Sequence, residues 1–281
     1  MSTLDSRLNA VRPDLADLRL KSIVEAPRYA NGSPHQVSAP IAAVRREPYT
    51  AATQITQALM GEACRVFETR EGWAWVQLDA DHYVGYIAED ALSAATAEPS
   101  HRVAVVSTFI YPAPNIKAQP VTPVPLNAKI AVAGREGKFA ALKNGGFVFA
   151  AHLKMVAEVE HDFVAVCELF QNVPYLWGGK SSAGLDCSGL VQLSLEVAGM
   201  ACPRDTDMQE RALGRPLRLG DLDSLQRGDL VFWNGHVGVM ANASDLIHAN
   251  GHHMSVAREP LSDAVARIQA SYGEITSLKR L

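Results

Sequence analysis

The chain has 281 residues, of which 48% are hydrophobic and 20% are charged, as in an ordinary globular protein. Its formal net charge of −4 argues against the clustered basic footprint of a nucleic-acid-binding protein. No apolar run reaches the roughly 18 residues of a transmembrane helix, so we expect no membrane partner. A chain of this length is expected to form two or three domains.

Residues 1–35 predict an N-terminal helical arm. Its apolar residues recur at roughly helical spacing, namely Leu4, Leu8, Val11, Leu15, Leu18 and Leu20. The run Asn31-Gly32-Ser33-Pro34 then ends the pattern. Charged residues interrupt any apolar stretch of signal-peptide length before Leu20, so we expect the protein to stay in the cytoplasm.

A different pattern, that of short strands separated by turns, is found in residues 36–97 and again in residues 98–157. The strand-like pieces are 55–59, 64–68, 73–78 and 83–87 in the first segment, and 103–109, 129–133, 139–142 and 146–149 in the second. The proline-rich stretch 112–125 reads as a long loop. We therefore predict two small all-β barrels in tandem.

Residues 158–281 predict an α+β domain. Two helices are expected over 159–171 and 188–198, the first ended by Pro174 and the second closed by Gly199. Strands are expected over 229–233, 236–241 and 245–249. A helix that leads into several antiparallel strands is typical of the α+β class.

Among the four cysteines, Cys187 stands out because it lies where a loop enters the second of these helices. The cysteines Cys64, Cys167, Cys187 and Cys202 match no zinc-binding spacing, and we expect no metal and no cofactor. Free N–H groups and the helix dipole at a helix start favour an anion, so a thiol there should ionise more easily. In the alternative reading, Asp186 or Ser188 merely caps the helix.

A nucleophilic cysteine needs a base, usually a histidine held by a third polar group. His236 opens an apolar strand directly after the turn Asn234-Gly235, and His248 lies on the next strand, where it could orient the first imidazole. His252 is a rival for this third role, but it sits beyond the strand. Each histidine taken singly is more often structural or exposed.

Five motifs in order resemble the NlpC/P60 peptidase family. They are Pro174-Tyr-Leu-Trp-Gly-Gly, Asp186-Cys-Ser-Gly-Leu-Val, Arg227-Gly-Asp-Leu-Val-Phe-Trp, His236-Val-Gly-Val and Leu246-Ile-His-Ala-Asn. The resemblance covers about residues 160–281 and implies a papain-like α+β fold. It also implies that Cys187 is the nucleophile, His236 the base and His248 the residue that orients it. The backbone N–H of Cys187 would then help to hold the oxyanion.

Two bacterial SH3-like modules before such a domain resemble the γ-D-glutamyl-L-diamino acid endopeptidases of murein recycling. The resemblance implies a cysteine endopeptidase acting on L-Ala-γ-D-Glu-diamino acid tripeptides or tetrapeptides whose first amine is free. In the substrate site it implies Glu47, Tyr83 and Asp186 at the ammonium, Arg204 at a carboxylate, Asp205 and Thr206 along the peptide, and Tyr175, Trp177 and Ser188 beside the nucleophile. His82 stands where a glycine is common in this family.

Three alternatives stay open at this point. The protein could be a hydrolase of intact peptidoglycan, a binding protein whose catalytic domain is inert, or an amidase or acyltransferase on the same fold. The missing signal peptide argues against the first, and the complete set Cys187, His236 and His248 argues against the second. The diamino acid, meso-diaminopimelate or L-lysine, and the oligomeric state are not readable from the sequence.

Overall fold

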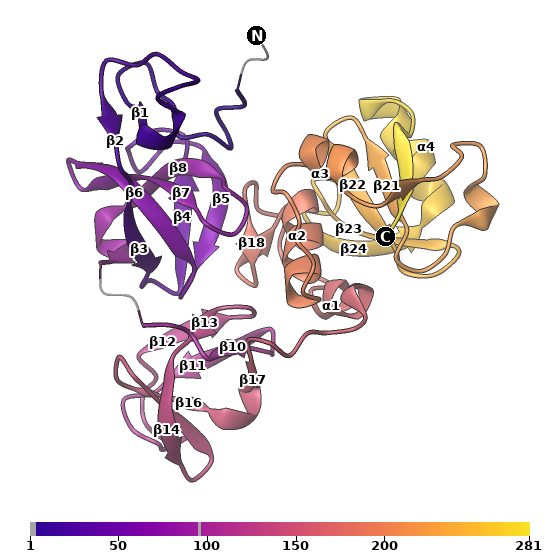
Figure 1. The fold of residues 1–281 in the computed structure, drawn as a ribbon. Coiled ribbons are helices and arrows are strands. Elements are labelled where there is room, and N and C mark those ends of the chain that lie inside the picture. The colour runs from indigo at the N-terminus through magenta and orange to yellow at the C-terminus, as the bar shows by residue number, and fades with distance from the viewer. Residues whose placement is uncertain (1–3, 95–96) are drawn as a thin grey trace. The chain divides into compact units, whose positions relative to one another are not determined.

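The computed structural model describes residues 4–94 and 97–281. The chain divides into two compact units, Met1–Glu158 and Val159–Leu281 (Figure 1). Each unit is described by itself. Among the described residues, no helix combines the length and apolarity that crossing a bilayer requires.

The first unit contains a seven-stranded antiparallel sheet with the strand order β5-β4-β8-β7-β6-β3-β9. Its strands are β3 (Ser33–Val37), β4 (Ile41–Arg45), β5 (Gln54–Leu59), β6 (Ala63–Arg70), β7 (Trp73–Leu78), β8 (Val84–Ala88) and β9 (Leu92–Ser93). The predicted strands β5 to β8 are confirmed. His82, in the turn before β8, has a φ of 61°. Glycine adopts this left-handed conformation more easily than histidine does.

The predicted N-terminal helix is wrong. The described residues before β3 form only β1 (Ala16–Asp17), which pairs in parallel with β2 (Tyr29–Ala30), and the 3₁₀ turn Leu18–Leu20. Pro13 lies in the middle of the expected helix, where its ring and its missing N–H oppose helical hydrogen bonding. Only Leu15 of the leucines in this segment is buried. It joins a cluster with Phe67 and Trp75, so the segment packs onto the sheet.

The rest of the first unit consists of three small antiparallel sheets, with strand orders β13-β10-β17, β11-β12 and β14-β15-β16. Their strands are β10 (His101–Val103), β11 (Ser107–Ile110), β12 (Thr122–Pro125), β13 (Lys129–Ile130), β14 (Val132–Glu136), β15 (Phe139–Leu142), β16 (Phe147–Phe149) and β17 (Leu153–Met155). The expected strand 103–109 is divided between β10 and β11. The end of the expected loop 112–125 pairs as β12, because Thr108 and Val124 face each other in the register.

The second unit has the predicted α+β layout. Its helices are α1 (Phe163–Leu169), α2 (Cys187–Val197), α3 (Thr206–Ala212) and α4 (Leu261–Tyr272). A six-stranded antiparallel sheet has the order β20-β25-β21-β22-β23-β24, and β18 (Lys180–Ser181) and β19 (Gly184–Leu185) form a separate hairpin. The sheet strands are β20 (Arg215–Pro216), β21 (Leu230–Trp233), β22 (His236–Met240), β23 (Asp245–Asn250), β24 (Ser255–Pro260) and β25 (Ser277–Arg280).

Two helices pack on the centre of this sheet. Helix α2 contacts β22 and β23, and helix α4 contacts β23 and β24. Met240 and Leu246 belong to a buried cluster with Ala264 and Ile268 of α4. Side chains alternate along a strand, so His236 shares the face of Met240, and His248 shares the face of Leu246. Both histidines therefore lie on the α4 side of the sheet.

Candidate active site

Cys187 is the first residue of α2, and its local structure is built by the residue before it. The Asp186 carboxylate caps the helix by accepting the Gly189 N–H at 2.7 Å. The first N–H groups of a helix have no partner within the helix, and Cys187 carries one of them. Its backbone can therefore donate toward an oxygen bound next to the thiol, as the sequence predicts for an oxyanion.

A glycine turn packs directly against this helix start. Gly178 donates its N–H to Asp186 Oδ2 at 2.8 Å, and the Gly179 carbonyl accepts from the Asp186 N–H at 3.2 Å. A Cβ on Gly189 would lie only 2.0 Å from the Gly179 oxygen. The glycine turn therefore approaches α2 where Gly189 has no side chain, and the motif glycines hold the start of α2 against the turn.

The Cys187 thiol is buried, with 8% of the residue exposed. Its Sγ lies 3.7 Å from the Thr206 hydroxyl at the start of α3. Burial and the Asp186 carboxylate raise the pKa of Cys187 to about 11, although Thr206 and the backbone N–H groups of Val237 and Ser188 favour the thiolate. The expected easily ionised thiol is therefore wrong, because desolvation outweighs the helix start.

The histidines form a hydrogen-bonded chain across β22, β23 and β24. His236 Nε2 lies 2.8 Å from His248 Nδ1, and His248 Nε2 lies 2.7 Å from Glu259 Oε1. The Arg267 guanidinium of α4 donates to the same Glu259 oxygen. Burial lowers the pKa of His236 to about 3 and lowers that of His248 as well. Both imidazoles are consequently neutral at neutral pH.

Glu259 and Arg267 were not predicted as site residues, and His252 does not take the third role. The His252 ring packs against His253 at a centroid distance of 4.8 Å. Possible metal-ligand atoms of His248, His253 and Glu259 lie within 4.8 Å of one another. Two of these residues already bond to each other, and the Arg267 guanidinium beside Glu259 repels a cation. We therefore assign the cluster to the histidine chain.

Asp186 and Arg204, both expected to contact substrate, bind each other. Arg204 donates from both terminal nitrogens to the two Asp186 oxygens, at 3.0 and 2.6 Å. It also donates to the Ser188 hydroxyl at 2.8 Å. The Arg204 side chain is 1% exposed. The pair thus ties α2 to the segment before α3 from within the core.

The other expected substrate residues of this unit differ in exposure. Tyr175 is half-buried, and burial together with the neighbouring Cys187 and Asp186 raises the pKa of its hydroxyl. Trp177 is 65% exposed on the glycine turn, where its ring could line a bound peptide. Asp205 is the N-cap residue of α3 and is half-buried.

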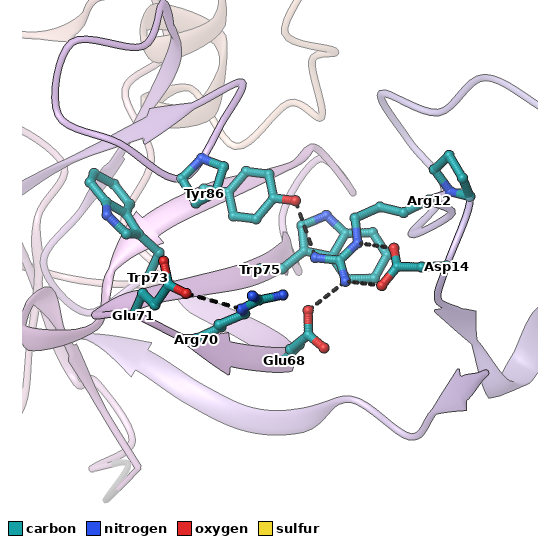
Figure 2. A pocket seen from close by; sticks show the side chains of 10 residues that line it. Arg12, Asp14, Glu68, Arg70, Glu71, Trp73, Trp75 and Tyr86 are labelled. Atoms are coloured by element: carbon teal, nitrogen blue, oxygen red, sulfur yellow. Dashed lines mark hydrogen bonds and ion pairs between the residues drawn. The ribbon is translucent and has the colours of Figure 1, made fainter. Parts of the chain in front are cut away.

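The first unit holds a pocket of about 380 Å³ between the N-terminal segment and the seven-stranded sheet (Figure 2). Its lining combines aromatic, proline and charged residues, namely Arg12, Pro13, Asp14, Pro48, Glu68, Arg70, Glu71, Trp73, Trp75 and Tyr86. The Arg12 guanidinium lies over the Trp75 ring, 4.4 Å from its centroid. Figure 2 shows its hydrogen bonds to Asp14, Glu68 and Tyr86. The expected residues Glu47 and Tyr83 do not line this pocket. Tyr83 is buried at 4% exposure, and Glu47 is half-buried.

Comparisons with known proteins agree with this geometry. Residues 172–270 match the NlpC/P60 family, and residues 44–92 match the bacterial dipeptidyl-peptidase SH3 domain. A γ-D-glutamyl-L-lysine dipeptidyl-peptidase from Bacillus cereus is 26% identical over 238 residues, which are 74% of this chain and 70% of that protein. Dipeptidyl-peptidase 6 from Lysinibacillus sphaericus is 39% identical over 77 residues, 27% of each protein.

A solved structure resembles the chain over most of its length. The crystal structure of an NlpC/P60 family protein from Bacillus cereus has a TM-score of 0.72 at 20% identity and covers 88% of this chain and 99% of its own. This likeness concerns the fold. The two family matches show that the chain carries an NlpC/P60 domain, which indicates a cysteine-type peptidase, and a bacterial dipeptidyl-peptidase SH3 domain.

Proposed function

We propose that this protein is a cysteine endopeptidase that cleaves the γ-D-Glu–diamino acid amide bond of murein peptides with a free N-terminal L-Ala, in cell-wall peptide recycling. One observation carries the peptidase assignment. The buried Cys187 thiol belongs to the first residue of helix α2, which packs against strand β22. The first residue of β22, His236, is hydrogen bonded to His248. The substrate assignment draws on the names of the relatives, one of which is a γ-D-glutamyl-L-lysine dipeptidyl-peptidase.

In the proposed mechanism, Cys187 is the nucleophile and His236 is the general base. The neutral imidazole takes the thiol proton as the sulfur attacks the γ-carbonyl carbon of D-Glu. The Cys187 N–H stabilises the oxyanion that forms. His236 returns its proton to the leaving amine, and the C–N bond breaks to give a thioester. Water then attacks the thioester, His236 accepts its proton, and the thiol is regenerated.

We propose substrate-recognition residues in each unit separately. Glu47 and Tyr83 would meet the ammonium of L-Ala, because a desolvated ammonium needs an acceptor or a carboxylate. The Asp186 carboxylate already accepts from Arg204 through both oxygens, which leaves it little capacity to bind an ammonium directly. The remaining contacts would come from Tyr175, Trp177, Ser188, Asp205 and Thr206. The division into 1–35, 36–97, 98–157 and 158–281, with two SH3-like barrels, is part of the same proposal.

The test is hydrolysis of L-Ala-γ-D-Glu-meso-diaminopimelate beside its N-acetylated form and the L-lysine analogue. Cys187→Ala serves as the blank. Cys167→Ala is the matched control, because Cys167 is also buried but lies on α1, bonded to Ser194. We expect cleavage of the free-amine peptide by the wild type and by Cys167→Ala only.

Two results would contradict this function. Equal cleavage of the free and the acetylated peptide would remove the amine-reading role of the first unit. If none of the three peptides is cut while Cys187 still reacts with iodoacetamide, the nucleophile is intact and the proposed substrate class is wrong.

A further inference from the structure

The chain of hydrogen bonds beyond His248 has a consequence for how the imidazoles carry their protons. We propose that Glu259 is a positioning residue that fixes the tautomers of His248 and His236, so that His236 presents its unprotonated Nδ1 to the thiol. This inference rests on the proposed role of Cys187 as nucleophile. It adds Glu259, supported by Arg267, as a positioning residue behind Cys187, His236 and His248.

The argument starts from the hydrogen-bonding capacity of a carboxylate. Burial alone would raise the pKa of Glu259, but the hydrogen bond and charge of His248, followed by the charge of Arg267, outweigh it and keep the carboxylate ionised. An ionised carboxylate only accepts hydrogen bonds, so at 2.7 Å the His248 Nε2 must carry the proton. In a neutral imidazole the other nitrogen is then an acceptor, which makes His248 Nδ1 the acceptor of the 2.8 Å bond from His236.

The same reasoning determines the state of His236. Its Nε2 must be the donor in that bond, so its proton is on Nε2 and its Nδ1 holds a free lone pair. A general base needs this lone pair to receive the thiol proton. Without an acceptor at Glu259, His248 could place its proton on Nδ1, and the His236 Nδ1 could then become the protonated nitrogen.

Sheet register explains why Glu259 reaches His248. Leu246 pairs with Glu259, and His248 pairs with Ala257. Paired residues of an antiparallel sheet point to the same face, and so do residues two apart on one strand. Glu259 is therefore the diagonal neighbour of His248 on the face that α4 covers, and Arg267 approaches from α4.

Charged groups near the two histidines also shift their pKa values. The charged or titratable groups that act on this pair are Glu259 of β24, Arg267 of α4 and His253 of the intervening turn, beside the two histidines themselves. Glu259 raises the pKa of both histidines, whereas Arg267 lowers it. Glu259 therefore also stabilises the imidazolium that forms when His236 accepts the thiol proton.

The experiment combines imidazole ¹⁵N spectra, which report tautomers directly, with the rate at which iodoacetamide alkylates Cys187. Neither readout depends on the murein substrate. In the wild type we expect both His236 and His248 to be protonated on Nε2. Glu259→Leu should lose this state and slow alkylation at pH 7 about 10- to 100-fold, the range seen when the carboxylate partner of a metal-binding histidine is removed.

Two further variants separate tautomer from charge. The amide oxygen of Glu259→Gln can still accept from His248 Nε2, so the tautomers should persist while the negative charge is lost. In Glu259→Gln, the alkylation rate should begin to fall at a lower pH than in the wild type, because the pKa values of the histidines are lower. In Arg267→Met, the rate should begin to fall at a higher pH. A role in folding alone would not produce opposite shifts.

The matched control is Asp229→Asn. Asp229 is 1% exposed and pairs with Arg280 in the same sheet, but it contacts neither histidine. It should leave the tautomers and the alkylation rate unchanged. The proposal is overturned if Glu259→Leu keeps both Nε2–H tautomers, or if Asp229→Asn slows alkylation as much as Glu259→Leu does.

Discussion

Removing the Arg204 side chain should destabilise the second unit far more than a surface ion pair could explain. In Arg204→Met, the Asp186 carboxylate keeps the N–H groups of Gly178 and Gly189 but loses both guanidinium bonds. The Asp186 side chain is 11% exposed, so water can replace little of that interaction. Removing one partner of a buried pair typically costs about 3–5 kcal/mol, against about 0–1 kcal/mol for an exposed pair.

The two units can be followed separately through their own buried cysteines. Pulse alkylation in increasing urea, read by mass spectrometry, reports unfolding of the second unit through Cys167 and of the first unit through Cys64. The free energy of unfolding follows from the midpoint and the slope of each transition. We expect the Cys167 transition of Arg204→Met to move by about 3–5 kcal/mol and the Cys64 transition to stay in place.

A double-mutant cycle with Asp186→Asn completes this test. The asparagine can still accept the Gly189 N–H and leaves no buried charge, so the double variant should be more stable than the sum of the single effects predicts, by about 0.5–3 kcal/mol. Strict additivity would refute the reasoning. An unchanged Cys167 transition in Arg204→Met would refute it too, and would leave substrate binding as the main role of Arg204.

Two further predictions use the same readouts. Gly189→Ala should destabilise the second unit by about 1–3 kcal/mol, because the added Cβ would lie 2.0 Å from the Gly179 carbonyl oxygen, although alanine normally favours a helix. Gly220→Ala is the control and should be neutral, because the added Cβ meets open space. Equal effects of the two changes would contradict the packing argument. The pKa of buried His236 lies below its unfolded value of 6.5, so the unfolded chain binds more protons between the two values and stability is lost as pH falls below about 6.5. Between pH 7 and pH 5 the free energy of unfolding should fall by about 2 kcal/mol for His236, and His248 adds a loss in the same direction. If the urea midpoint of the Cys167 transition does not fall over this range, the two histidines are not buried in the neutral form.

Local patterns predicted the elements that carry the motifs. Helix α2 begins one residue from its expected start, and strands β21 to β23 follow the expected ranges. These segments have apolar patterns bounded by Gly and Asn turns, so local and tertiary preferences agree. Helix α4 was missed, although Leu261, Ala264 and Ile268 have helical spacing and are buried. In the N-terminal segment, similar spacing predicted a helix that does not form, because Pro13 opposes helical hydrogen bonding and Leu15 packs onto the sheet instead.

Residues of the candidate site could be proposed from the sequence where they stand in a motif, but not where strand register brings them together. Cys187, His236 and His248 each stand in a recognisable short run. Glu259 lies 11 residues beyond His248, in a strand without any local signal, and only the pairing of β23 with β24 brings the two together. Likewise, the sequence contains Asp186 and Arg204 but no indication that they would neutralise each other inside the core.

The balance of burial and charge around the thiol favours a particular order of events. Burial raises the pKa of Cys187 and lowers that of His236, so desolvation favours the neutral form of each group. A preformed thiolate–imidazolium pair would place two charges in a desolvated site, which is costly unless each is compensated. Attack by the thiol would therefore occur together with proton transfer to His236. The charge then appears on the imidazole only while the oxyanion exists, and Glu259, ionised and bonded to His248, is the group already oriented to compensate it.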